Sequence, residues 1–121
     1  MSLRDFAASP AAESIRRIDF DSAEVVGDFP GGHILLVRGE APCANMEVRL
    51  SPLIYIDCPE YWGIEVLGSL PGNICLTTLK PFKLTIPLAG ITGSRGIEVL
   101  GGRRSEQIEV EGGCERGGCF E

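Results

Sequence analysis

The chain has 121 residues, of which 44% are hydrophobic, and these values fit one globular domain rather than a disordered segment. The formal net charge of −6 at pH 7 disfavours nucleic acids and anionic membrane surfaces as partners, because phosphate groups bind basic surfaces. No apolar stretch is long enough to cross a bilayer, and the first ten residues lack the apolar segment of a secretory signal, so we expect a cytoplasmic protein.

The predicted elements are short β-strands separated by turns. Residues 1–13 are rich in Ala and Ser without a clear period, and we expect a loosely ordered arm there. Apolar and polar residues then alternate in short runs, which is typical of strands. In chain order, the expected strands are residues 15–26, 33–38, 44–50, 53–57, 63–68, 74–78, 82–88, 96–101 and 107–111. Residues 113–121, rich in Gly and Cys, are expected to form a flexible tail.

Three of these strands carry further expectations. Residues 33–38 are an apolar run, which predicts a strand buried on both faces. Residues 74–78 follow a Pro-Gly turn and are expected to pair with residues 63–68 as a hairpin. The alternation is cleanest in residues 82–88, where Pro87 lacks an N–H group, so this strand is expected at a sheet edge or to stop there.

The strand spacing predicts the fold class. About eight or nine short strands, punctuated by 16 glycines and 8 prolines, favour an all-β domain over residues 14–112. Its architecture is expected to be an antiparallel β-sandwich or a small barrel. A parallel sheet is not expected, because its crossover helices need about a dozen residues and the chain has no room for them.

A hexapeptide, GIEVLG, occurs twice, at residues 63–68 and 96–101. Each copy precedes a turn and a further strand, so a strand–turn–strand unit is used twice and a pseudo-symmetric sandwich is expected. In each copy the Ile and Val side chains share one face, while the Glu and Leu side chains share the other. The glycines at either end permit tight turns or the close approach of another backbone.

Paired acidic residues are the candidate catalytic groups. Glu65 and Glu98 hold equivalent places in the two copies, and Asp57 lies shortly before the first. If the fold brings the two glutamates together, their like charges raise one pKa, and such a pair can act as general acid and base in hydrolysis. The alternative is two surface glutamates that point into water.

Two further segments are candidate binding sites. Tyr61 and Trp62 are the adjacent aromatic pair of the chain, which fits either an anchor for a partner protein or a plug at the end of the core. Residues 90–96 are rich in glycine and contain Arg95, so their N–H groups could cradle an anion. An ordinary connection between strands is the alternative for this loop.

The chain contains five cysteines: Cys43, Cys58, Cys75, Cys114 and Cys119. The first three are expected to be small core residues, reduced in the cytosol. The last two are expected to form an oxidation-prone end rather than a zinc site, which normally takes four ligands. With one histidine, His33, and no C-x-x-C spacing, we expect no metal and no other cofactor.

These observations favour a small β-sandwich module without a catalytic signature. It is expected to act through contact with a protein partner or through self-association, because strand edges offer surfaces for pairing. The alternative is a carboxylate-dependent, aspartic-type hydrolase or a self-cleaving protein built on the paired acidic residues. A thiol or metal protein would require the cysteines to cluster.

Overall fold

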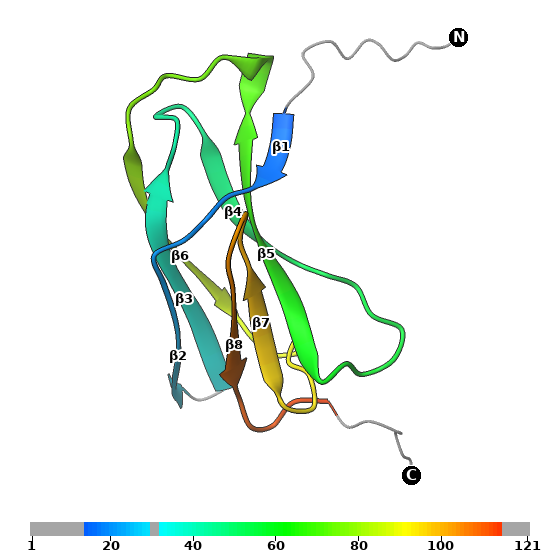
Figure 1. The fold of residues 1–121 in the computed structure, drawn as a ribbon. Helices are drawn as coiled ribbons and strands as arrows, with labels where there is room; N and C mark the ends of the chain where they lie inside the picture. Colours follow the sequence, from blue (N-terminus) through cyan, green and yellow to red (C-terminus); the bar gives the residue numbers. More distant parts are fainter. Residues whose placement is uncertain (1–13, 30–31, 115–121) are drawn as a thin grey trace, which may run out of the picture.

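The structure is a computed structural model that describes residues 14–29 and 32–114. This part of the chain folds into eight β-strands and one short 3-10 turn (Figure 1). The strands are β1 (Ser14–Arg17), β2 (Ser22–Phe29), β3 (Gly32–Ala41), β4 (Glu47–Pro52), β5 (Tyr61–Leu70), β6 (Lys80–Pro87), β7 (Gly96–Leu100) and β8 (Ser105–Glu109), and the turn is η2 (Pro71–Asn73). The predicted all-β class is confirmed. The predicted N-terminal arm lies outside the described residues, as does most of the predicted tail.

The strands form two sheets. One is antiparallel, in the order β2-β3-β6. In the other, β5 is central: β4 lies along one of its edges, β1 and β7 share the other edge, and β8 pairs with β7. Buried residues of both sheets form one core cluster, so the arrangement is sandwich-like rather than a closed barrel.

The core is supplied by the apolar face of each strand, and the repeat lies at its centre. In both copies the Ile and Val side chains point inward and are fully buried, as the alternation predicts. The buried residues of the cluster are Ile18, Phe20, Leu35, Val37, Ala41, Cys43, Met46, Ile64, Val66, Leu70, Leu88, Ile97, Val99 and Val110. Burial of a large apolar side chain contributes about 1.5–3 kcal/mol, so this cluster is the main source of stability.

The two copies of the repeat lie next to each other, and they pair in parallel. The register places Trp62 beside Ile97 and Gly63 beside Glu98. The other described pairings are antiparallel, as predicted, and the β5–β7 pair departs from that prediction. The reason is that the connection between them needs no helix, because it runs through β6 in the opposite sheet (Figure 1).

The first glycine of each copy is required for a close approach. A Cβ atom on Gly96 would lie 2.0 Å from the carbonyl oxygen of Ile108 on β8. A Cβ atom on Gly63 would lie 2.8 Å from Leu53 Cδ1 and 3.0 Å from Tyr55 Oη. Gly96 therefore lets β8 lie close to β7. Gly63 lets the segment after β4 lie against β5.

Several local expectations are corrected. Residues 53–57 and 74–78 are not strands but loops, since neither forms a ladder with a neighbouring strand. The predicted strand 15–26 is two strands, because the chain crosses from one sheet to the other between β1 and β2. Residues 33–38 are fully buried on one face only. The edge position of the strand that contains Pro87 is confirmed, because β6 pairs only with β3 among the described strands.

Four cysteines are oxidised, which corrects the expectation of reduced thiols. Cys43 is bonded to Cys75, and Cys58 is bonded to Cys114. The tail is therefore tied to the domain at Cys114, while Cys119 lies outside the described residues. The described ranges contain no helix with the length and apolar character needed to cross a membrane.

Candidate functional site

The most unusual surface feature is a loop that exposes two isoleucines. Residues 53–60 join β4 to β5 and swing out from the sandwich (Figure 1), and we call them the first apolar loop. The side chain of Ile54 is 95% exposed and that of Ile56 is 100% exposed. Exposure of this degree leaves the apolar area of both side chains in water, and it marks the loop as a candidate contact surface.

The first apolar loop is held by the residue between the two isoleucines. Tyr55 turns inward, and its hydroxyl accepts a hydrogen bond of 3.1 Å from the N–H of Gly63. Its ring meets that of Trp62 edge to face, with the ring centroids 5.0 Å apart. The indole N–H of Trp62 donates to the carbonyl of Leu53 at 2.9 Å. The tip is therefore presented by an anchored segment.

The far end of the same loop is tied down as well. The Cys58–Cys114 disulfide joins it to the segment after β8. The carbonyl of Pro59 accepts a hydrogen bond from Ser94 N, and that of Glu60 accepts from Arg95 N, both at 2.8 Å. The loop is therefore already ordered in the free chain. Little conformational entropy would be lost on binding, which favours binding by this loop.

These contacts also decide how residues 90–96 are used. The N–H groups of residues 93–96 donate to the carbonyls of Gly96, Pro59 and Glu60. An anion-binding nest needs N–H groups that are free, and here they are engaged. The loop is instead the connection from β6 to β7, and it supports the first apolar loop.

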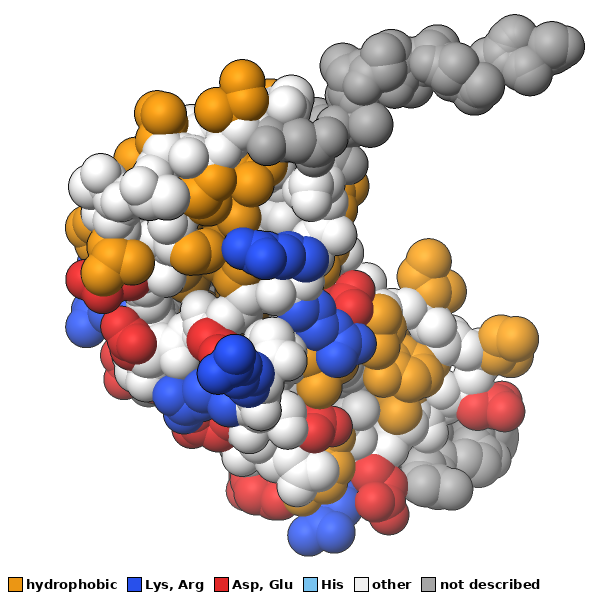
Figure 2. Space-filling model, turned by 45° about the horizontal axis from the view of Figure 1, so that its top comes forward, with side chains coloured by type: hydrophobic (Ala, Val, Ile, Leu, Met, Phe, Trp, Pro, Cys, Tyr) orange, Lys and Arg blue, Asp and Glu red, His pale blue; other side chains and the backbone are white. Residues whose placement is uncertain are grey.

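A second exposed apolar segment lies at the opposite end of the sandwich (Figure 1). Residues 74–79, which we call the second apolar loop, join η2 to β6. Ile74 is 65% exposed, Leu76 54% and Leu79 62%. Figure 2 shows hydrophobic side chains gathered at two separate places, at the top and on the lobe that projects at the right.

The second apolar loop is anchored in the same manner as the first. The Asn45 side chain donates to the carbonyl of Ile74 at 2.6 Å and accepts from the N–H of Leu76 at 3.1 Å. The Ala44 N–H donates to the carbonyl of Leu76 at 2.8 Å. The Cys43–Cys75 disulfide ties the loop to the end of β3. Each apolar loop is thus held by one disulfide and by side-chain hydrogen bonds.

The residues predicted to be catalytic are partly brought together. Glu65 and Glu98 project from the same outer face of the neighbouring strands β5 and β7. Glu98 lies beside Gly63, and Glu65 is two residues further along β5. Strands lie about 4.8 Å apart and rise about 3.3 Å per residue, so their Cα atoms are roughly 8 Å apart. Glu65 is engaged by Arg17, whose Nε lies 2.8 Å from the carboxylate. Asp57 lies on the first apolar loop and is exposed.

Among the described residues, no hydrogen bond joins Glu65 to Glu98. A shared proton requires the two carboxylates to be in contact, and the Arg17 guanidinium offers Glu65 an opposite charge instead. No contact between the two carboxylates in the described structure therefore supports the predicted hydrolase.

The two residues of the predicted aromatic pair have different roles. Trp62 packs against the core and anchors the first apolar loop, as described above. Tyr61 lies on the outer face, where its hydroxyl donates to the carboxylate of Glu109. The Arg95 guanidinium lies 5.5 Å from the centre of the Tyr61 ring and 3.7 Å from that carboxylate. The hydrogen bond to Glu109 raises the pKa of Tyr61 above 10.0, because it stabilises the protonated phenol.

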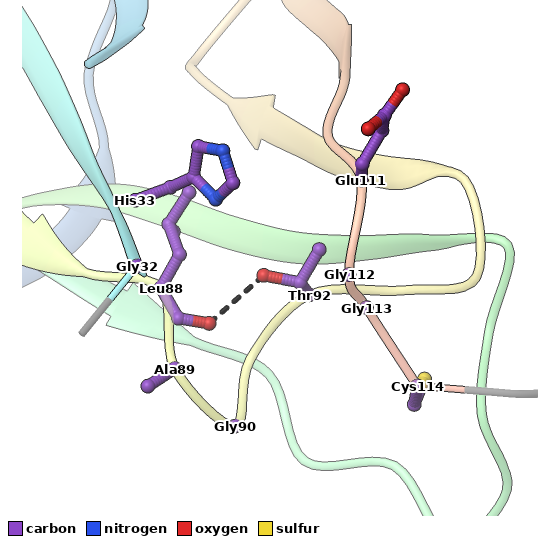
Figure 3. A pocket seen from close by; sticks show the side chains of 10 residues that line it. All are labelled: Gly32, His33, Leu88, Ala89, Gly90, Thr92, Glu111, Gly112, Gly113 and Cys114. Carbon is purple, nitrogen blue, oxygen red and sulfur yellow. Dashed lines mark hydrogen bonds between the residues drawn. The ribbon is translucent and has the colours of Figure 1, made fainter. Parts of the chain in front are cut away.

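A hollow of about 450 Å³ lies near the start of β3 (Figure 3). Its walls include His33, Thr92, Glu111 and several glycines. The Thr92 hydroxyl donates to the carbonyl of Leu88 at 2.8 Å, while the carboxylate of Glu111 points away from the His33 ring (Figure 3). The side chains that line it therefore form no acid–base pair or nucleophile–base pair.

Comparison with models of protein families, with curated proteins and with solved structures finds no significant match. Sequence reasoning missed both apolar loops, because it assigned their apolar residues to strands. Each loop contains a cysteine, Cys58 in the first and Cys75 in the second. These cysteines are the sequence signal that could have identified the loops.

Proposed function

We propose that the domain is a self-associating module in which the first apolar loop of one copy contacts the second apolar loop of the next. The observation that carries the proposal is the exposure of Ile54 and Ile56 on an anchored loop. A chain retains such a costly surface where a partner covers it. The second apolar loop supplies an apolar counterpart on the same chain.

The positions of the loops determine the kind of assembly. They lie at opposite ends of the sandwich, so one loop can meet the other only on a different copy (Figure 1). When two copies make this contact only once, it is heterologous, and its repetition produces an open chain or a ring. This is the assembly we expect.

The strength of the contact follows from the apolar area. Burial of five large apolar side chains contributes roughly 7–15 kcal/mol at about 1.5–3 kcal/mol each. Association costs about 4–15 kcal/mol in lost translational and rotational freedom. Because the two contributions are of similar size, we expect a weak contact, with a dissociation constant on the order of micromolar to millimolar. A tether or a high local concentration would be needed to populate long chains.

The test uses two variants, each with one loop disabled. I54D/I56D places charges on the first apolar loop, and L76D/L79D places them on the second. The matched control is I15D, which changes an exposed isoleucine on β1, outside both loops. Sedimentation equilibrium is measured from about 10 μM to about 1 mM, the range in which a weak contact is populated.

The proposal expects the wild type and I15D to form species larger than dimers as concentration rises. Each double variant alone should remain monomeric. An equimolar mixture of the two should form a 1:1 dimer and nothing larger, since each contributes its one intact loop. The proposal is overturned by a wild type that stays monomeric at about 1 mM. A dimer of L76D/L79D alone would also overturn it, because the first loop would then bind itself.

The hydrolytic alternative stays a prediction. Its direct test is the intact mass of purified wild-type protein and of E98Q after equal incubation. Truncation or water loss in the wild type but not in E98Q would favour it. An unchanged full-length mass in both would exclude self-cleavage.

A cytoplasmic location also stays a prediction, and the two disulfides argue against it. Disulfides persist in oxidising compartments, whereas cytosolic thiols are kept reduced. Protein extracted from cells directly into an alkylating reagent distinguishes the two. At most one modified cysteine would indicate an oxidising compartment, and modification of all five would indicate the cytosol.

A further inference from the structure

The fold brings the two arginine doublets of the chain together. Arg16 and Arg17 end β1, while Arg103 and Arg104 lie in the turn between β7 and β8. Arg16, Arg17 and Arg103 line one hollow of about 420 Å³, which we call the arginine pocket. Figure 2 shows Lys and Arg side chains gathered near the middle of the face in view. In a chain of net charge −6, this is a local concentration of positive charge.

Asp19 builds the pocket by fixing the turn beside β1. One carboxylate oxygen accepts hydrogen bonds from the N–H groups of Arg103, at 2.6 Å, and Arg104, at 3.3 Å. The turn is closed by a bond of 2.8 Å from Gly101 N to the carbonyl of Arg104. The Asp19 carboxylate and this backbone bond therefore set the position of Arg103 relative to β1.

Each doublet contains one engaged arginine and one with no ionic partner among the residues that the structure describes. Arg17 is paired with Glu65, and Arg104 donates to the carbonyls of Phe20 and Asp21. Within the described part of the chain, no ion pair or hydrogen bond engages the guanidinium of Arg16 or of Arg103. Two guanidinium groups without a partner among residues 14–29 and 32–114 thus line a hollow that a third arginine also borders.

The acidic residues of the pocket form no ion pair with Arg16 or Arg103 among the described residues, although they balance the arginines in formal charge. One oxygen of Asp19 is occupied by the backbone of the turn. Glu40 lies on the opposite wall beside Pro42, and it is exposed and has no ion pair among the described residues. Arg17 is already balanced by Glu65, so the capacity of the pocket for an anion comes from the guanidinium groups of Arg16 and Arg103, which bond to no described residue.

We infer that the arginine pocket binds a compact tetrahedral dianion, a phosphate or sulfate group. Guanidinium groups from two segments can each donate two hydrogen bonds to different oxygens of such a group, which a monovalent carboxylate matches less well. The pocket is a single hollow rather than a basic stripe, so it does not fit a nucleic-acid backbone. The site is independent of the two apolar loops.

The test is an NMR titration of the full chain with inorganic phosphate, inorganic sulfate and acetate, each at constant ionic strength maintained with NaCl. The inference expects saturable shifts of the Gly102, Arg103 and Arg104 amide signals with phosphate and with sulfate. R16Q and R103Q should each weaken binding by about tenfold, the value of one charge-assisted hydrogen bond. R49Q, across β5 from Arg17 and outside the lining of the pocket, is the matched control and should leave the affinity unchanged.

E40Q tests the sign of the effect. Removal of the Glu40 charge should tighten phosphate binding by about threefold, because an exposed negative charge in the lining of the pocket repels the anion. Equal losses in R49Q and R103Q would overturn the inference, as would weaker binding in E40Q. Acetate that binds as tightly as the two dianions would overturn the assignment of ligand class. If phosphate binds and sulfate does not, or the reverse, the result identifies which of the two sources supplies the ligand.

Discussion

Removal of the disulfide between Cys58 and Cys114 should cost a large part of the stability of the domain. The two cysteines are 56 residues apart, so the bond closes a long loop in the unfolded chain. In the chain-entropy account, a loop of this length contributes about 4 kcal/mol at 25 °C. A domain of this size has about 5–15 kcal/mol in total, so C58S/C114S is expected to be close to the limit of folding.

Urea unfolding followed by tryptophan fluorescence provides the measurement, because Trp62 lies beside the first apolar loop. The midpoint should fall, and the dependence of the free energy of unfolding on urea should steepen, since the unfolded chain becomes less compact without the cross-link. C43S/C75S is the comparison, with cysteines 32 residues apart and a similar expected cost. A loss below about 1 kcal/mol with an unchanged slope would refute the reasoning.

Three further predictions follow from particular side chains. G96A should destabilise the domain by about 3 kcal/mol or more, measured by urea unfolding, because its new methyl group would meet a backbone carbonyl of β8 at 2.0 Å. I97A should cost about 2–5 kcal/mol because Ile97 is fully buried, whereas I54A should change stability by less than about 0.5 kcal/mol. The pKa of Tyr61 should lie above its ordinary value, and E109Q should lower it, as followed by phenolate absorbance; an unchanged titration would show that the hydrogen bond to Glu109 is not the cause of the raised pKa.

The sequence predicted those parts of the fold that depend on local alternation. In each copy of the repeat, Ile and Val alternate with Glu and Leu, and this is enough to place the copies on strands with the correct face inward. The same reasoning failed for residues 53–57. Ile54, Tyr55 and Ile56 have the composition of a strand, but no neighbouring strand pairs with them, and pairing is a property of the whole sheet.

The candidate sites depend on contacts between distant residues, and this is why they were not found. The pairing of four cysteines, the parallel alignment of β5 with β7 and the meeting of Arg16 with Arg103 all join residues more than 30 positions apart. Spacing along the chain carries no information about such meetings. Trp62 is an intermediate case. A position in the core is one of the two interpretations that the sequence allows, but its hydrogen bond to Leu53 follows only from the conformation of the loop.

The order of the disulfides along the chain has a consequence for proteolysis. Cys58 lies between Cys43 and Cys75 in the sequence, and its partner Cys114 lies after both. The two closed loops therefore overlap along the chain. A single cut anywhere between Cys43 and Cys114 therefore leaves the fragments joined by at least one disulfide. Exposed loops are preferred sites of nicking, and both apolar loops lie inside this span. A protease that cleaves either loop would thus leave one covalent molecule, which separates into two pieces only after reduction.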